Sequence, residues 1–149
     1  MERLKVTQRA ELLARLCRKY RVDALYAFGS RACDVKAWMG NNHTMLAPGP
    51  SDVDIGAKPT SGERFSVREK VQLALALEDL LDVQRVDLVS LRDADPFLAA
   101  NIIRGERLYA RNTQQADEYE LYVLRRAGDL VPLERERMAL ILGSRNDTR

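Results

Sequence analysis

Cysteine, histidine and long apolar runs are scarce in this sequence, and each scarcity argues against a class of protein. Cys17 and Cys33 are its only cysteines, and His43 is its only histidine. A structural zinc site usually needs four such ligands, and a disulfide-dense secreted scaffold needs more cysteines. No segment approaches the run of roughly 18 apolar residues that a membrane span requires, and the N-terminal residues lack the apolar core of a signal peptide. We therefore expect a cytoplasmic protein without a membrane anchor.

A strong excess of charge of either sign is also missing. The 149 residues carry a formal net charge of +2, which argues against a protein that coats nucleic acid through bulk charge. Hydrophobic residues make up 46% of the chain, an ordinary share for a globular protein with a core. At this length we expect a single domain over residues 1–149, with a core at about 6–110 and C-terminal helices at about 113–142.

Segments of helical and strand character alternate along the chain. Helical spacing is found over residues 6–20, 66–81, 97–104 and 114–127, and again from Pro132 onward. The short apolar runs typical of strands are residues 23–28, 52–57, 85–89 and 106–110. Ser66 with Glu69 forms a capping pattern at one helix start, and Asp95-Pro96 begins another helix, which Gly105 ends. This alternation predicts an α/β fold in which a mixed β-sheet is flanked by helices.

Residues 31–51 are rich in residues that interrupt regular structure. They include a glycine, two adjacent asparagines and a Pro-Gly-Pro sequence, so we expect much of this segment to be a loop. It also contains Trp38, Met39 and Met45. Two interpretations of these side chains stay open: they pack within the loop, or they form an exposed apolar surface for a partner.

Two aspartates share one face of a predicted strand. Side chains two residues apart on a strand point to the same side, so Asp52 and Asp54 project together while Val53 and Ile55 face the core. Two carboxylates held together repel each other and raise a pKa unless a cation lies between them. Mg²⁺ prefers such oxygen ligands and is often held by one or two carboxylates together with substrate phosphates. The pair predicts a site for Mg²⁺ or Mn²⁺.

Asp87 and Gly29-Ser30 complete the candidate site. Asp87 lies within another predicted strand, where aspartate is uncommon, and would add a third carboxylate to the metal cluster. Gly29 and Ser30 follow a strand, where backbone N–H groups at a turn bind anions and the Ser30 hydroxyl adds a donor. Arg31 either contacts phosphate by bidentate hydrogen bonds or is a surface arginine. A site for triphosphate beside two metal ions meets the requirements of nucleotidyl transfer.

The order of these features resembles the DNA polymerase β-like nucleotidyltransferase superfamily. A strand with Gly-Ser is followed by a strand with Asp-X-Asp, a helix and a strand with Asp, and the likeness runs from about Tyr26 to Tyr109. The short chain is similar to the minimal nucleotidyltransferases, which are often found as antitoxins beside HEPN-domain proteins. The segments VDLVSLRDADPFLAANIIRGERLYA and YELYVLRRAGDL carry the same likeness. Residues 31–51 form a longer gap than the family usually has between its two motifs.

The resemblance implies a role for each site residue. Gly29 and Ser30 would hold the triphosphate, Asp52 and Asp54 would hold metal, and Asp87 would help bind the catalytic metal and activate the acceptor hydroxyl. The reaction would move a nucleoside monophosphate, AMP from ATP, to a tyrosine of a HEPN-type toxin.

Two alternatives to this function stay open. One is an antitoxin without turnover that acts by binding its partner. The other is an antibiotic-modifying transferase with a small acceptor, for which the residues after Tyr109 leave little space. A partner nucleic acid is not indicated, and self-association is left open.

Overall fold

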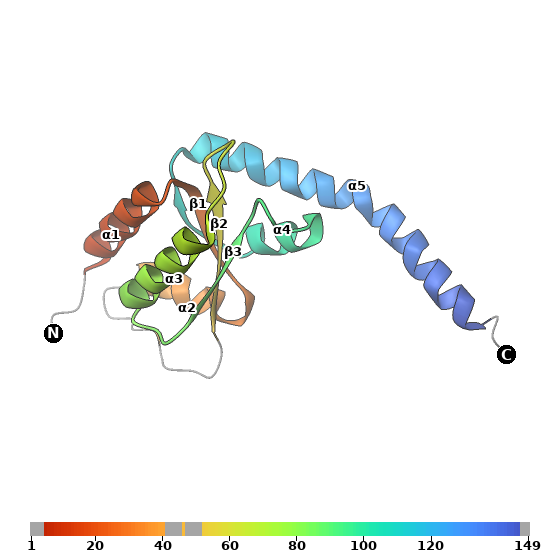
Figure 1. Ribbon diagram of the computed structural model, residues 1–149, viewed down its shortest axis with the longest axis horizontal. Coiled ribbons are helices and arrows are strands. Elements are labelled where there is room, and N and C mark those ends of the chain that lie inside the picture. Colours follow the sequence, from red (N-terminus) through yellow and green to blue (C-terminus); the bar gives the residue numbers. More distant parts are fainter. Residues whose placement is uncertain (1–4, 41–45, 47–51, 147–149) are drawn as a thin grey trace.

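The chain folds as a mixed sheet covered by helices on both faces (Figure 1). The computed structural model describes residues 5–40, 46 and 52–146. The helices are α1 (Val6–Lys19), α2 (Ala32–Gly40), α3 (Val67–Leu81), α4 (Pro96–Ile103) and α5 (Thr113–Asn146). The strands are β1 (Val22–Phe28), β2 (Val53–Pro59), β3 (Val86–Ser90) and β4 (Glu106–Ala110), and a 3₁₀ turn, η1 (Gly29–Arg31), joins β1 to α2.

The four strands form one sheet in the order β3-β2-β1-β4. β1 is antiparallel to both β2 and β4, whereas β2 and β3 run parallel. A parallel pair needs a crossover connection, and α3 supplies it between β2 and β3. The predicted α/β fold with a mixed sheet is confirmed.

Each face of the sheet has its own apolar core. On one face, α1, α2 and α3 pack against the sheet through residues such as Leu13, Val35 and Leu77. On the other face, α4 and the first half of α5 pack on Tyr26 and its neighbours. Figure 1 shows α1, α2 and α3 on one side of the strands and α4 and α5 on the other. The two groups of helices therefore bury the sheet from both faces.

The two predicted helix starts are confirmed by their hydrogen bonds. The Glu69 amide donates to the Ser66 hydroxyl at 3.1 Å, and the Ser66 amide donates to the Glu69 carboxylate at 3.1 Å. The Asp95 carboxylate accepts from the amides of Phe97 and Leu98, both at 2.9 Å. These caps satisfy amides that have no partner within their helices, which fixes where α3 and α4 begin.

The expectation of a loop over much of residues 31–51 is wrong for its first half. Residues 32–40 form α2, because Val35 and Trp38 are spaced to share one helix face and both are buried. The Arg9 guanidinium of α1 lies 4.6 Å from the centre of the Trp38 ring and donates to the Trp38 carbonyl. Trp38 is therefore a core residue and not an exposed partner surface. Met45 falls outside the described residues.

The C-terminal residues form one helix where two were expected. α5 continues from Thr113 to Asn146 through Pro132, which was predicted to begin a separate helix. Ala116, Val123 and Ala127 of its first half are buried, and its second half extends beyond the sheet (Figure 1). None of the helices in the described residues combines enough length and apolar character to span a bilayer.

A substitution at Gly105 tests how closely the connection between α4 and β4 approaches the backbone of β1. A Cβ atom at this position would lie 2.2 Å from the Ala27 carbonyl oxygen and 3.1 Å from the Phe28 Cα. These are backbone atoms of the central strand, which cannot swing aside. Gly105→Ala should lower the free energy of unfolding in urea by about 2 kcal/mol or more.

The matched control is Gly128→Ala in α5, where a Cβ would meet nothing within 4 Å. That change should raise stability by up to about 1 kcal/mol, because alanine favours helix. Equal stability of the two variants would contradict the close approach at Gly105.

Candidate active site

The register of β2 and β3 brings two aspartates together. Asp54 and Asp87 are direct partners in the parallel pair, as are Val53 and Val86 next to them. Val53 and Val86 are buried in the core beneath α1, α2 and α3, so alternation along the strands turns both aspartates to the opposite face. Asp52 lies one residue before β2 and two before Asp54. The structure therefore pairs Asp54 with Asp87, and Asp52 lies two residues before Asp54 on the same strand side.

The electrostatics of Asp54 reflect these neighbours. Burial raises the pKa of its carboxyl above the usual range, and the negative charges of Asp87 and Asp52 raise it further. Asp54 is half-buried, whereas Asp87 is exposed on β3, at the edge of the sheet. Each cause disfavours the charged form of Asp54. A cation placed between the carboxylates would reverse the effect of the two like charges.

Gly29 touches Asp54 from the neighbouring strand. Phe28 at the end of β1 pairs with Asp54, and the chain then turns through Gly29 with a φ of +74°. A Cβ on Gly29 would lie 2.4 Å from Asp54 Oδ2. The left-handed backbone conformation therefore favours glycine here, and a side chain would push the Asp54 carboxylate aside. The phosphate-binding motif predicted from the sequence is in direct contact with the predicted metal strand.

The residues after Gly29 begin a helix. Ser30 is exposed in η1, and α2 follows at Ala32. Arg31 is only 8% exposed, and its Nε lies 3.7 Å from Asp34 Oδ2. A helix start presents free backbone amides and a positive dipole end, a combination that binds anions. The turn predicted to bind phosphate thus lies beside Asp54.

Asp52 is engaged by a residue that the sequence did not point to. Arg85, just before β3, places its Nε 3.5 Å from Asp52 Oδ2. Nowhere in the described residues do three carboxylate, thiol or imidazole side chains converge as they would around a metal ion. Asp52 is therefore turned toward Arg85 instead of toward Asp54 and Asp87. A lone arginine ahead of a strand carries no sequence signal, and only the pairing of β2 with β3 brings it to Asp52.

The comparison with protein families matches the part of the chain that contains the candidate site. A family model described as "Polymerase beta, Nucleotidyltransferase" matches residues 11–114. The comparison with curated proteins gives no match.

Several solved structures are similar to this protein over nearly its whole length. One chain of a crystal structure of a mutant MntA–HpeT toxin–antitoxin has 22% identity and a TM-score of 0.64, over 91% of this chain and 97% of that chain. A toxin–antitoxin structure with AMP-PNP gives the same identity, coverage and TM-score. One chain of the tri-AMPylated Shewanella oneidensis HEPN toxin in complex with MNT antitoxin has 23% identity and a TM-score of 0.60, over 93% of this chain and 98% of that chain. At these identities the likeness establishes the fold.

The raised pKa of Asp54 leads to a prediction about stability and pH. A carboxyl whose pKa is higher in the folded state binds its proton more readily there, so its ionisation destabilises the fold as pH rises. In metal-free buffer near neutral pH, Asp54→Asn should raise the melting temperature by up to about 2 °C. The difference should vanish below about pH 3.9, where the carboxyl is protonated in both states.

Asp79→Asn on the exposed surface of α3 serves as the control and should show no such pH-dependent gain. A melting temperature that falls in Asp54→Asn at neutral pH, without metal, would show that the charge of Asp54 stabilises the fold.

Proposed function

Because the chain belongs to the polymerase beta nucleotidyltransferase family, whose model matches residues 11–114, we propose that it transfers AMP from ATP to a hydroxyl group. The proposal rests on one observation above all. Asp54 lies in register with Asp87 on one side and in contact with Gly29 on the other. Carboxylates for metal and a backbone turn for phosphate therefore meet at a single point, as nucleotidyl transfer requires.

Asp52, Asp54 and Asp87 would hold Mg²⁺ or Mn²⁺. The donor set fits, because it consists of carboxylate oxygens and because the repulsion at Asp54 calls for a cation. The bound metal would supply positive charge for the attacking oxygen and for the leaving pyrophosphate. Asp52 would have to rotate away from Arg85 to join the other two carboxylates.

The turn at Gly29 would bind the triphosphate. Backbone amides at η1 and at the start of α2, together with the exposed Ser30 hydroxyl, are the donors available there. Arg31 would add positive charge to this region, although its burial beside Asp34 leaves it poorly placed for a bidentate contact. Glycine at position 29 would let phosphate bind to the backbone close to the Asp54 carboxylate.

Asp87 would accept the proton of the attacking hydroxyl. It is exposed and stands on β3, an edge strand of the sheet, so a large acceptor has access to it. The similar structures include an AMPylated HEPN toxin in complex with an MNT antitoxin and a toxin–antitoxin with an ATP analogue, AMP-PNP. These support a HEPN-type partner as the acceptor, and within it we propose a tyrosine hydroxyl.

One observation favours a second candidate, an antitoxin that acts by binding alone. Asp52 is paired with Arg85, and the three carboxylates do not converge. If that arrangement persists with nucleotide bound, the site would not complete its metal cluster. The two candidates differ in turnover, and the experiments below separate them.

Asp87→Asn should abolish transfer and spare much of the nucleotide affinity. Its carboxylate acts on the acceptor and on the catalytic metal, whereas the triphosphate contacts lie at Gly29 and Ser30. We expect turnover to fall at least about 100-fold. The assay incubates the protein with labelled ATP, GTP, CTP or UTP, with and without a HEPN-type partner, and measures label on the partner and nucleotide binding separately.

Asp93→Asn, an exposed change in the loop that follows β3, is the control and should keep full activity. Normal turnover in Asp87→Asn would remove Asp87 from the mechanism. Binding of the partner without any labelling by the wild type would favour the binding-only antitoxin.

Arg85→Ala should strengthen metal binding. The guanidinium competes with a cation for Asp52, and an ion pair between groups this exposed is worth little, so the gain should be about twofold to fivefold. Mn²⁺ affinity without nucleotide, measured by electron paramagnetic resonance, tests this directly.

Arg64→Ala, on an exposed residue before α3, should leave Mn²⁺ affinity unchanged. Weaker binding in Arg85→Ala would mean that the arginine orients Asp52 for the metal and does not compete with it.

A further inference from the structure

One side of α5 is exposed and rich in both apolar and charged side chains. The helix packs on the domain through Ala116, Val123 and Ala127, which are buried. Away from that side, Tyr122 is 57% exposed and Leu133 is 60% exposed. Large apolar side chains at such exposure, along a helix that runs past its own domain, indicate a surface that another chain covers.

Six exposed residues of α5 follow one another in steps of three or four. Residues so spaced are neighbours on one side of a helix, and we call this set the α5 strip. Its members are Glu118, Tyr122, Arg126, Asp129, Leu133 and Arg137, all of them exposed. The strip spans roughly 30 Å at the rise of an α-helix.

The α5 strip is complementary to a second copy of itself that runs in the opposite direction. Its first residue is acidic and its last is basic, its second and fifth are apolar, and its third and fourth are Arg126 and Asp129. An antiparallel copy would place Glu118 opposite Arg137, Tyr122 opposite Leu133 and Arg126 opposite Asp129. Each pair then occurs twice, once on each side of a twofold axis between residues 127 and 128. This is the pattern of an isologous interface, in which one surface pairs with itself.

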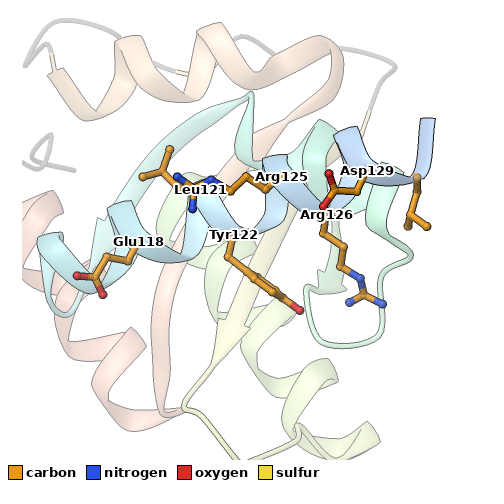
Figure 2. A pocket seen from close by; sticks show the side chains of 7 residues that line it. Glu118, Leu121, Tyr122, Arg125, Arg126 and Asp129 are labelled. Atoms are coloured by element: carbon orange, nitrogen blue, oxygen red, sulfur yellow. The ribbon is translucent and has the colours of Figure 1, made fainter. Parts of the chain in front are cut away.

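A hollow lies along the first half of the strip. It has a volume of about 540 Å³, and Tyr122, Arg126 and Asp129 are among the residues that line it. Figure 2 shows Tyr122 and Arg126 extending to the same side of α5 at this hollow. In the antiparallel arrangement Leu133 of the second copy arrives at this position.

We propose that the α5 strip is a homodimer interface, in which a second copy of this chain packs antiparallel along it. The apolar contacts of Tyr122 with Leu133 would supply most of the affinity. The charged pairs are exposed, so each adds little energy, but together they fix the direction and register of the two helices. The pairing does not depend on the proposed function, and nucleotide and metal take no part in it.

Charge reversal at the centre of the strip tests the pairing. Arg126→Asp places an aspartate opposite Asp129 of the second copy, and Asp129→Arg places two arginines together. Each single variant should dimerise at least about tenfold more weakly than the wild type. An equimolar mixture of the two variants restores opposite charges at both positions, so a heterodimer should form. The double variant Arg126→Asp/Asp129→Arg should dimerise like the wild type.

The measurement is analytical ultracentrifugation of the full chain over a concentration series that reaches about 1 mM. Arg135→Asp changes an exposed arginine of α5 outside the strip and is the matched control, with dimerisation unchanged. Circular dichroism of each variant checks that α5 remains helical. A wild type that stays monomeric over the whole series would overturn the proposal, and so would single reversals that leave dimerisation unchanged or a mixture that fails to recover it.

Discussion

The repulsion between Asp54 and Asp87 is the constraint around which the site is arranged. The two carboxylates are direct partners across a parallel pair of strands, a position that a purely structural protein would fill with uncharged or opposite charges. The fold holds them there because the strands are fixed by buried neighbours such as Val53 and Val86. Burial and the neighbouring negative charges both disfavour the ionised form of Asp54. The backbone thus holds two like charges side by side before any ligand binds.

Close approaches at two glycines make that arrangement possible. Gly29 lets β1 turn against the Asp54 carboxylate, and Gly105 lets the chain between α4 and β4 pass over the backbone of β1. A side chain at position 29 would displace the Asp54 carboxylate, and one at position 105 would meet the backbone of β1. The position of the carboxylates therefore depends on residues that contribute no chemical group of their own.

The fold was largely predictable because its signals are local. The Ser66 and Asp95 caps and the Asp-X-Asp spacing are short-range patterns, and the structure shows the caps and pairs Asp54 with Asp87. The α2 helix was missed because Gly40 and the polar residues after it outweighed a short apolar pattern. Its stability comes from distant contacts, among them the stacking of Arg9 on Trp38.

Two further features depended on information that local patterns do not contain. α5 runs through Pro132, although proline in a helix interior usually ends or kinks the helix. Arg85 meets Asp52 only because β3 lies beside β2, a pairing that spacing along the chain does not reveal. The three aspartates were identifiable from the sequence, whereas the arginine that competes for one of them was not.

The order of the strands in the sheet has a consequence for how the protein is made. β1 is central, yet both of its neighbours, β2 and β4, come later in the chain. During synthesis β1 therefore leaves the ribosome with both edges unpaired, and one edge stays open until β4 follows. Its side chains are nearly all buried in the finished protein, so the nascent chain exposes an apolar strand of the kind that aggregates. Until residue 110 has emerged, β4 cannot close that edge, although α1, α2 and α3 can already cover one face of β1.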